Sequence, residues 1–337
     1  MSEIPSWTPL HARLHRTLRQ KKLLPKNQQV LVAVSGGQDS LCLSKLLLDL
    51  QPKWKWQLGI AHCDHRWPYD EGISLHVQQI AQSWGLPFHL RSAPEVKKSE
   101  SAARQWRYQA LIDIAQTQGY PTVVTGHTKS DRAETVLYNL IRGSGTDGLQ
   151  ALTWERHLAP GVSLVRPLLD TSRSETLQFC EQQQLSIWVD AYNQDLNYAR
   201  NRIRQELIPY IKTHFNPQVE TALSQIAEIL RADVEYLENT AEQIQKQAMA
   251  APTVEEDPGS NSPPRLNRLV LQQAPLALQR RVIRKFLQEN QIKGLNFEQI
   301  EAVTGLIAAP NRSRTSSFPG GVTALVEEEW IILKYQV

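Results

Sequence analysis

The fold is most clearly indicated by residues 29–50, QVLVAVSGGQDSLCLSKLLLDL. The apolar run at 29–34 predicts a buried strand, and the residues from Ser40 onward have the apolar spacing of a helix. Between them, Gly36 and Gly37 let the backbone turn sharply and approach an anion closely. A helix start directly after such a turn offers free N–H groups and a dipole that favour phosphate oxygens. The segment therefore predicts a phosphate-binding loop at the end of a strand.

Six consecutive residues make up the predicted nucleotide loop: Ser35, Gly36, Gly37, Gln38, Asp39 and Ser40. Asp39 would repel a phosphate unless a cation lies between them, so its position predicts a Mg²⁺ site. In the alternative interpretation, Asp39 and Ser40 only cap the helix. A Walker A loop is excluded because GxxxxGK[ST] does not occur. The GxGxxG match at 143–148 follows a helical segment instead of a strand, which disfavours a dinucleotide site.

Strand-like and helical segments alternate over the first two-thirds of the chain. This alternation predicts an α/β fold, namely a doubly wound, Rossmann-like parallel sheet with helices on both faces. Ligands in such sheets bind beyond the carboxyl ends of the strands. The predicted strands are 29–34, 57–63, 86–91 and 120–126, separated by helical segments at 40–50, 73–85 and 101–119.

The sequence pattern changes near Pro217. We therefore predict a catalytic domain at 1–217 and a smaller, mostly helical domain at 218–337. The second domain is expected to contain a long helix, a Pro/Gly/Ser-rich linker, two further helices and a terminal hairpin, at 218–250, 251–265, 276–290, 297–308 and 320–335.

Composition excludes several classes of protein. Hydrophobic residues make up 41% and charged residues 21%, so the chain can bury a core and is not globally disordered. No apolar run reaches the length of a membrane span, and the N-terminus has no apolar signal region, so a cytoplasmic protein is expected. The three cysteines, Cys42, Cys63 and Cys180, are far apart in sequence. Their number and spacing exclude a disulfide framework and a four-cysteine zinc site.

Arginine residues are clustered, although the net charge is only +3. Several cations together suit a phosphate backbone, because neutralising phosphates releases counterions. A solvated charged helix face is the alternative for any one cluster. The clusters are Arg200, Arg202 and Arg204; Arg280, Arg281, Arg284 and Lys285; and Arg312 with Arg314.

The loop SGGQDS resembles the SGGxDS loop of the PP-loop, or N-type, ATP pyrophosphatases. That resemblance implies cleavage of ATP between the α- and β-phosphates and transfer of AMP to a carbonyl or carboxylate. Residues 126–135, GHTKSDRAET, resemble the GHxxDDxxET stretch shared by tRNA(Ile)-lysidine synthases and some tRNA thiolases. Ser130 replaces the first Asp of that pattern. His127 and Asp131 follow a predicted strand, where they can order a metal, orient a nucleophile or accept a proton.

A third segment, 166–209, resembles lysidine synthases in particular. Residues 275–287, PLALQRRVIRKFL, resemble the first C-terminal domain of the same family. The thiolases need a pair of catalytic cysteines, for which this chain has no plausible pair. The residues of the third segment that match the lysidine synthase pattern are Asp190, Asn193, Arg200, Asn201, Arg202 and Arg204.

Two shorter matches are weaker. Residues 62–68, HCDHRWP, resemble the family's HxDHGLR, with RWP in place of GLR. Strand alternation places His62 and Asp64 on one face and Cys63 on the other, so polar packing beside the nucleotide is expected instead of a zinc site. The helix around Arg104 is similar to the family's AR..RY helix, in which an arginine could neutralise the α-phosphate. A surface helix arginine is the alternative.

The resemblance to lysidine synthases implies a complete reaction. ATP with Mg²⁺ would adenylate the wobble cytidine in the CAU anticodon of an isoleucine tRNA, and free lysine would then displace AMP. Another tRNA-modifying PP-loop enzyme, such as a thiolase, and a catalytically dead RNA-binding homologue remain the alternatives. A homodimer stays open, and no membrane partner is expected. The predicted catalytic residues are Asp39, His127, Asp131, Arg104 and Arg202, and the predicted tRNA-binding residues are Arg200, Arg204, Arg280, Arg281 and Arg284.

Overall fold

The computed structural model describes residues 7–68, 71–95, 99–189, 195–249, 263–292, 294–318 and 320–335. It divides into two compact units, Met1–Arg231 and Ala232–Val337, each with its own hydrophobic core. The division falls within the long helix α10 (Val219–Met249). The predicted boundary after residue 217 lies just before this helix.

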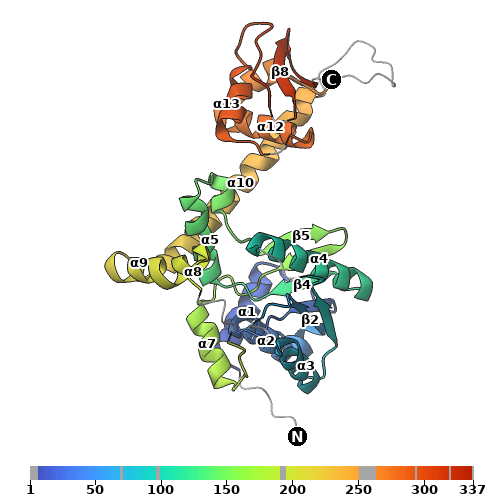
Figure 1. Cartoon of the computed structure of the whole chain (residues 1–337), viewed down its shortest axis with the longest axis vertical. Helices are drawn as coiled ribbons and strands as arrows, with labels where there is room; N and C mark the ends of the chain where they lie inside the picture. The colour runs from blue at the N-terminus through green and yellow to red at the C-terminus, as the bar shows by residue number, and fades with distance from the viewer. Residues whose placement is uncertain are drawn as a thin grey trace. The chain divides into compact units, whose positions relative to one another are not determined.

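The first unit is built on a six-stranded sheet with the order β3-β2-β1-β4-β6-β5. Neighbouring strands are parallel except β5 and β6, which form an antiparallel pair at one edge. A mostly parallel sheet covered by helices confirms the predicted α/β class (Figure 1). The β5–β6 pair was not predicted. The strands are β1 (Gln29–Ala33), β2 (Gln57–Asp64), β3 (Phe88–Ser92), β4 (Thr122–Thr125), β5 (Glu155–Ala159) and β6 (Val162–Val165).

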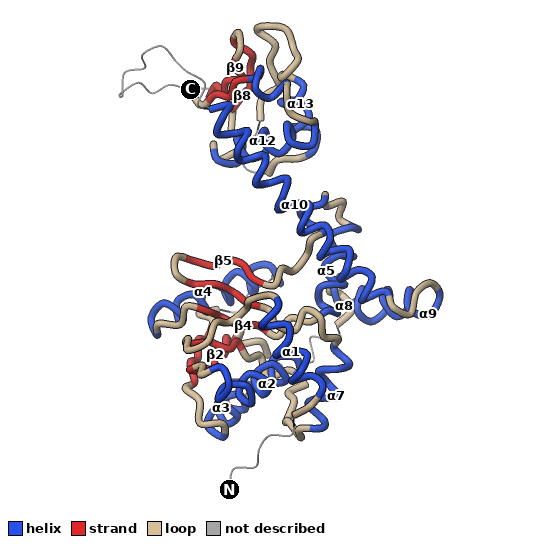
Figure 2. Tube along the Cα trace, turned by 180° about the vertical axis from the view of Figure 1, so that it is seen from behind, coloured by secondary structure: helices blue, strands red, loops and turns tan. Residues whose placement is uncertain are grey.

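Helices cover both faces of this sheet, as Figure 2 shows. On one face, α1, α2, α3 and α7 share a buried cluster with β1 and β2. On the other face, Leu111 and Ile114 of α4 pack on Leu31. Helix α5 packs on the segment that contains α8, a π-helical turn and α9. The helices are α1 (Pro9–Gln20), α2 (Gln38–Trp54), α3 (Ile73–Ser83), α4 (Glu100–Gln118), α5 (Lys129–Ile141), α6 (Thr146–Leu149), α7 (Arg173–Gln182), α8 (Ala199–Arg202), the π-helical turn (Ile203–Leu207) and α9 (Ile208–His214).

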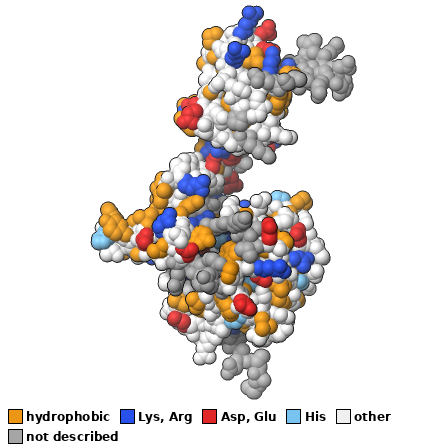
Figure 3. Space-filling view, viewed as in Figure 1, with side chains coloured by type: hydrophobic (Ala, Val, Ile, Leu, Met, Phe, Trp, Pro, Cys, Tyr) orange, Lys and Arg blue, Asp and Glu red, His pale blue; other side chains and the backbone are white. Residues whose placement is uncertain are grey.

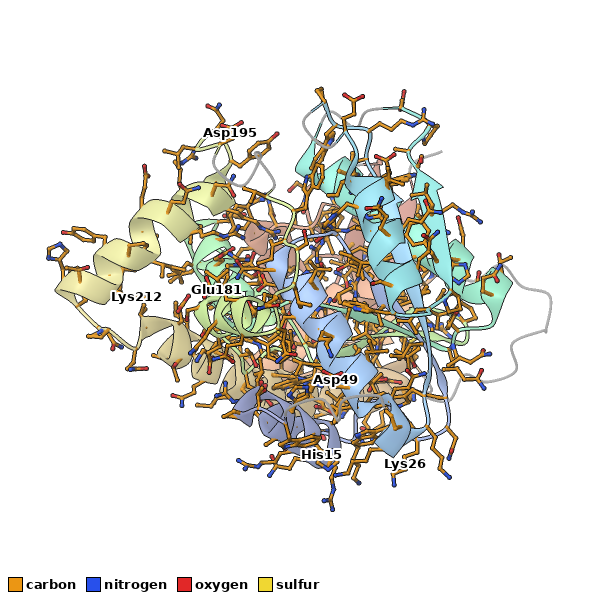
Figure 4. The ribbon with its side chains drawn as sticks, turned by 90° about the horizontal axis from the view of Figure 1, so that it is seen from below. His15, Lys26, Asp49, Glu181, Asp195 and Lys212 are labelled. Carbon is orange, nitrogen blue, oxygen red and sulfur yellow. The ribbon has the colours of Figure 1, made fainter. Side chains whose placement is uncertain are left out.

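The contact between α1 and α2 contains a buried polar pair. His11 Nε2 lies 3.1 Å from Asp49 Oδ2, and Lys45 donates to Asp49 Oδ1 at 2.6 Å. One turn further along α1, the ring of His15 meets that of Trp54 edge to face. Figure 4 shows His15 and Asp49 on the same side of the unit. These contacts hold α1 against α2 on one face of the sheet. Helix α1 was not predicted from the sequence.

The second unit contains a three-stranded antiparallel sheet with the order β7-β9-β8. Its core includes Phe286 of α12, Val303 of α13 and Val326 of β8. Most of the predicted linker at 251–265 lies outside the described residues. No helix in the described part of the chain combines the length and hydropathy that a bilayer crossing requires. The elements after α10 are β7 (Arg265–Asn267), α11 (Arg268–Gln272), α12 (Leu276–Glu289), α13 (Phe297–Gly305), β8 (Val322–Glu327) and β9 (Trp330–Tyr335).

Close packing over β2 gives a test of the fold. A Cβ atom on Gly59 would lie 2.2 Å from Tyr120 Oη and 2.7 Å from Tyr120 Cζ. We expect Gly59→Ala to lower the free energy of unfolding by about 1–3 kcal/mol, because overpacking forces side chains off their preferred rotamers. Urea unfolding followed by circular dichroism measures this change.

Gly145→Ala is the matched control in the same unit. A Cβ atom there meets nothing within 4 Å, and φ is −70°, which suits any L-residue. Because Gly145 is only the N-cap of α6, the expected loss is about half a kcal/mol or less. Equal losses in the two variants would contradict the tight packing of Tyr120 on β2.

Candidate active site

A cavity of about 590 Å³ is lined by residues at the carboxyl ends of β1, β2 and β4. Open α/β sheets bind their ligands in this position. The predicted loop contributes Ser35, Gly37, Gln38, Asp39 and Ser40 to the lining, and the segment after β4 contributes His127 and Asp131. Further lining residues come from elsewhere in the chain and include Ile73, Arg107, Tyr108, Arg173 and Trp188.

The loop after β1 is held by its own hydroxyl groups and by the segment after α7. The Ser40 hydroxyl donates to the Gly37 carbonyl at 2.8 Å and accepts from the Ser35 N–H at 3.2 Å. The Trp188 N–H donates to the Gly36 carbonyl at 3.0 Å. Gly36 has φ +86°, a left-handed conformation that L side chains rarely adopt. The glycine turn is therefore a structural requirement of the loop.

Gly126, at the end of β4, permits a close approach to the same loop. A Cβ atom on Gly126 would lie 2.7 Å from the Asp39 carbonyl oxygen and 2.9 Å from the Ser40 nitrogen. Backbone atoms cannot move aside as a flexible side chain can. The missing Cβ therefore lets the segment of His127 and Asp131 lie directly against the start of α2.

One guanidinium group joins three carboxylates, of which Asp39 and Asp131 line the cavity and Glu134 does not. Arg173, the first residue of α7, donates from Nε to Asp39 Oδ2 at 3.1 Å and from Nη2 to Asp131 Oδ1 at 2.7 Å. Its Nη1 donates to Glu134 Oε1 at 3.2 Å. The Thr176 hydroxyl also donates to Asp39. The Arg173 guanidinium thus pairs both with the loop after β1 and with the acidic residues near the start of α5.

Arg204 completes this acidic cluster from the π-helical turn. Its Nε and Nη2 donate to the two oxygens of Glu134 at 2.7 and 2.9 Å. Glu134 is 3% exposed, so both arginines are needed to offset its buried charge. Neither Arg173 nor Glu134 was predicted from the sequence as a site residue. The spacing of Asp131 and Glu134, three residues apart on one helix face, was a usable signal for Glu134.

Arg202 was predicted to be catalytic, but its guanidinium lies elsewhere. Arg202 is exposed and donates to the carbonyl oxygens of Leu196 and Asn197 at 2.7 and 3.1 Å. Arg204, predicted to bind tRNA, lines the cavity instead. Residues two apart on a helix point in nearly opposite directions, so only one of the two can face the cavity.

The protonation states of His127 and Asp131 follow from burial and from each other. Burial lowers the pKa of His127 to about 3, although the nearby Asp131 carboxylate opposes this shift. Burial raises the pKa of Asp131, but Arg173, His127 and the Thr128 hydrogen bonds outweigh it and lower it to about 2. At neutral pH His127 is therefore uncharged and Asp131 is a carboxylate. Burial also raises the pKa of Asp39, against the opposing effect of Arg173.

Helix α5 begins with a capping box that fixes Asp131. The Thr128 N–H and hydroxyl donate to Asp131 Oδ2 at 2.7 and 2.8 Å. Oδ1 is thus left to face Arg173. Ser130, which stands where the family pattern has an Asp, accepts from the Arg173 N–H at 3.2 Å. In this chain Ser130 therefore helps to place Arg173.

Two cysteines that are far apart in sequence are neighbours in the fold. Cys42 of α2 and Cys180 of α7 are both buried, and the Cys180 thiol donates to the Gln38 carbonyl at 3.3 Å. Burial, followed by the contact with Cys180, raises the pKa of Cys42 far above its usual range. No such pair was predicted from the sequence. The structure places these two thiols together, and burial keeps the Cys42 thiol protonated and unreactive.

The other predicted arginines that the structure describes are not among the residues that line the cavity. Arg104 packs over the ring of Tyr108, and Arg200 packs over that of Tyr138. In the second unit, Arg280 pairs with Glu301, whereas Arg281 and Arg284 both pair with Glu238. Arg312 and Arg314 are exposed. The predicted residues Asp190 and Asn193 lie outside the described residues.

Comparison with known families and proteins gives matches along nearly the whole chain. A PP-loop domain matches residues 9–211, and a TilS substrate-binding domain matches residues 266–328. A tRNA(Ile)-lysidine synthase of Nostoc sp. strain PCC 7120 is 60% identical over 333 residues, which cover 97% of each chain. A chloroplastic protein of that name from Zygnema circumcarinatum is 33% identical and covers 86% of this chain and 78% of its own length.

A solved structure shares the fold. The U34-tRNA thiolase NcsA from Methanococcus maripaludis superimposes with a TM-score of 0.55 at 17% identity, covering 66% of this chain and 77% of its own. At that identity the likeness concerns the fold alone. The high identity to the synthases, together with both matched domains, shows that this chain belongs to the tRNA(Ile)-lysidine synthase family.

Proposed function

We propose that this protein uses ATP to join free lysine to C2 of the wobble cytidine in the CAU anticodon of isoleucine tRNA. The cytosine O2 attacks the α-phosphorus of ATP, and pyrophosphate leaves. The ε-amine of lysine then attacks C2 and displaces AMP. The product, lysidine, changes the codon and amino-acid identity of the tRNA from methionine to isoleucine.

The observation that supports this proposal is the sharing of Arg173 between Asp39 and the pair Asp131 and Glu134. Asp39 belongs to the loop that suits phosphate, whereas the pair belongs to α5 and already binds guanidinium cations. A nucleotide and a cationic amine can therefore occupy one cavity within a few ångströms of each other. Such placement raises the effective concentration of the nucleophile and can be worth about 7–11 kcal/mol.

In the adenylation step, the acting groups are those of the loop after β1 and of the residues around it. The N–H groups at the start of α2 face phosphate oxygens, and Arg107 lines the cavity, where it can stabilise charge on the α-phosphate. Arg107 is thereby better placed than Arg104 for that role. Asp39 fits a Mg²⁺ ligand, since its carboxylate already binds a cation at 3.1 Å. When bound there, Mg²⁺ would neutralise charge on the departing pyrophosphate.

In the lysine step, Asp131 and Glu134 bind and position the amine. Both carboxylates lie on α5 and bind cationic nitrogen in the structure, so they suit the ammonium group of lysine. Neither Asp131, with a pKa of about 2, nor His127, with a pKa of about 3, can hold a proton from an amine whose pKa is about 10.4. These residues therefore position the amine, and its proton leaves to solvent before the attack.

The direct test is mass spectrometry of isoleucine tRNA after incubation with the protein, ATP and lysine. We expect a mass gain that matches lysine less one water at the wobble cytidine, and release of AMP and pyrophosphate. Incorporation of sulfur would favour a thiolase, which the burial of Cys42 and Cys180 and the raised pKa of Cys42 disfavour. Binding of tRNA without any mass change would leave only an RNA-binding protein.

Substitution of Asp39 and substitution of Asp131 should impair different steps of the reaction. We expect Asp39→Asn to abolish tRNA-dependent pyrophosphate release. We expect Asp131→Asn to retain that release but to raise the KM for lysine by about 10- to 100-fold, as a lost hydrogen bond between charged groups would. Asparagine keeps the shape of Asp131 and can still accept from Thr128. Loss of adenylation in both variants to the same degree would contradict the separation of roles.

The pKa values predict the pH dependence of the lysine step. Because neither Asp131 nor His127 takes up a proton near neutrality, the reaction needs lysine with a neutral ε-amine. We expect kcat/KM for lysine to rise about tenfold per pH unit from pH 6.5 to 9, as expected below an amine pKa of about 10.4. His127→Gln should leave this slope unchanged. A plateau above pH 6.5 that disappears in His127→Gln would show that His127 acts as the base.

A further inference from the structure

Four arginine side chains converge on the ring of Tyr108, and we call them the Tyr108 arginine cluster. The guanidinium carbons of Arg104, Arg107 and Arg156 lie 5.0, 5.8 and 4.6 Å from the ring centre, within the range of cation–π contact. Arg166, which follows β6, is only 2% exposed and lies close enough to lower the pKa of the Tyr108 phenol together with Arg104. Helix α4, strand β5 and the end of β6 each contribute to the cluster.

No carboxylate balances these charges in the part of the chain that the structure describes. None of the four arginines forms an ion pair there. Burial lowers the pKa of both Arg104 and Arg166, and neighbouring arginines lower it further. Guanidinium groups remain protonated in proteins, so the repulsion between these charges lowers the stability of the folded state. A partly buried group of like charges indicates an anionic ligand.

Other arginines of the same unit contrast with the cluster. Arg132 is buried and pairs with Glu228 at 3.2 Å, and Arg204 pairs with Glu134 at 2.7 Å. Arg13, on the surface, pairs with Glu175 at 2.6 Å. Carboxylate partners are thus available to arginines elsewhere in this unit, and the Tyr108 arginine cluster lacks them.

The cluster extends outward from the wall of the active-site cavity. Arg107 and Tyr108 line that cavity, whereas Arg104, Arg156 and Arg166 do not. Arg156 is exposed on the edge strand β5, three strands away from β1 in the sheet order. At about 4.8 Å per strand, β5 lies about 14 Å from the strand that leads into the phosphate loop. In the space-filling view, both Lys or Arg and Asp or Glu side chains lie on the surface around α4 (Figure 3).

We propose that the Tyr108 arginine cluster binds the backbone phosphates of the anticodon-loop nucleotides next to the reacting cytidine. This inference rests on the proposed function, in which a single base enters the cavity. A base that enters the cavity must bring its own ribose and flanking phosphates to the rim. Arg107 lines the cavity, and the other arginines of the cluster extend the positive charge from there to the exposed Arg156, where the flanking phosphates can bind.

The test compares Arg156→Gln with Arg16→Gln, which removes an exposed arginine of α1. Binding of an anticodon stem-loop RNA is measured from 50 to 300 mM KCl without ATP or lysine. We expect Arg156→Gln to weaken binding and to reduce the magnitude of the salt slope by about 0.7, the value for one phosphate contact on a single strand. Arg16→Gln should not change the slope, and Arg156→Lys should restore it.

Two outcomes would overturn the proposal. An unchanged salt slope in Arg156→Gln would show that the cluster does not bind RNA phosphates. A raised KM for ATP with unchanged RNA binding would identify the nucleotide as its anion. Because the binding assay needs no chemistry, its result is separate from the failure of wild-type protein to form lysidine, which would contradict the proposed function instead.

Discussion

The ion pairs of Arg173 hold together the parts of the chain that form the site. Its three N–H directions reach Asp39 after β1 and both Asp131 and Glu134 on α5. Each of these carboxylates is mostly or fully buried, so each needs a cation nearby to remain charged. The planar guanidinium suits this task because its donors point in fixed, separate directions. The position of α7 is therefore tied to the nucleotide loop by electrostatics as well as by apolar packing.

Two regions of opposite charge border the same cavity. Around Arg173 the carboxylates outnumber the arginines, whereas around Tyr108 the arginines have no described carboxylate partner. A reaction that joins a cationic amine to a polyanionic RNA benefits from this separation, because each reactant meets the opposite charge on its own side. The low dielectric of a closed site strengthens both effects. Gly126 lets the segment that carries His127 and Asp131 lie against the start of α2, which brings the acidic groups of the cavity together.

Strands β1, β2 and β4 were predictable because they are mostly buried in the centre of the sheet. Strands β1 and β4 are short apolar runs, which is typical of a central parallel sheet. Strand β5, with the sequence ERHLA, is mostly exposed at the edge, so it lacks that signal. Helix α1 had a signal in its sequence, namely the capping residue Thr8 and apolar residues four apart. The division of the chain inside α10 could not be predicted, since nothing in the composition of a continuous helix marks it.

The fold class and the family could be predicted from the sequence alone, as could a glycine turn between β1 and α2. These features depend on short segments of the chain, such as a strand followed by two glycines and a helix start. Which charged groups share the site depends instead on the tertiary structure. Arg173 is 134 residues from Asp39 in sequence, and Cys180 is 138 residues from Cys42. It also decided that Arg204 faces the cavity while Arg202 does not. Such choices depend on the packing of distant segments and on the balance of buried charge, and neither is encoded in a local pattern.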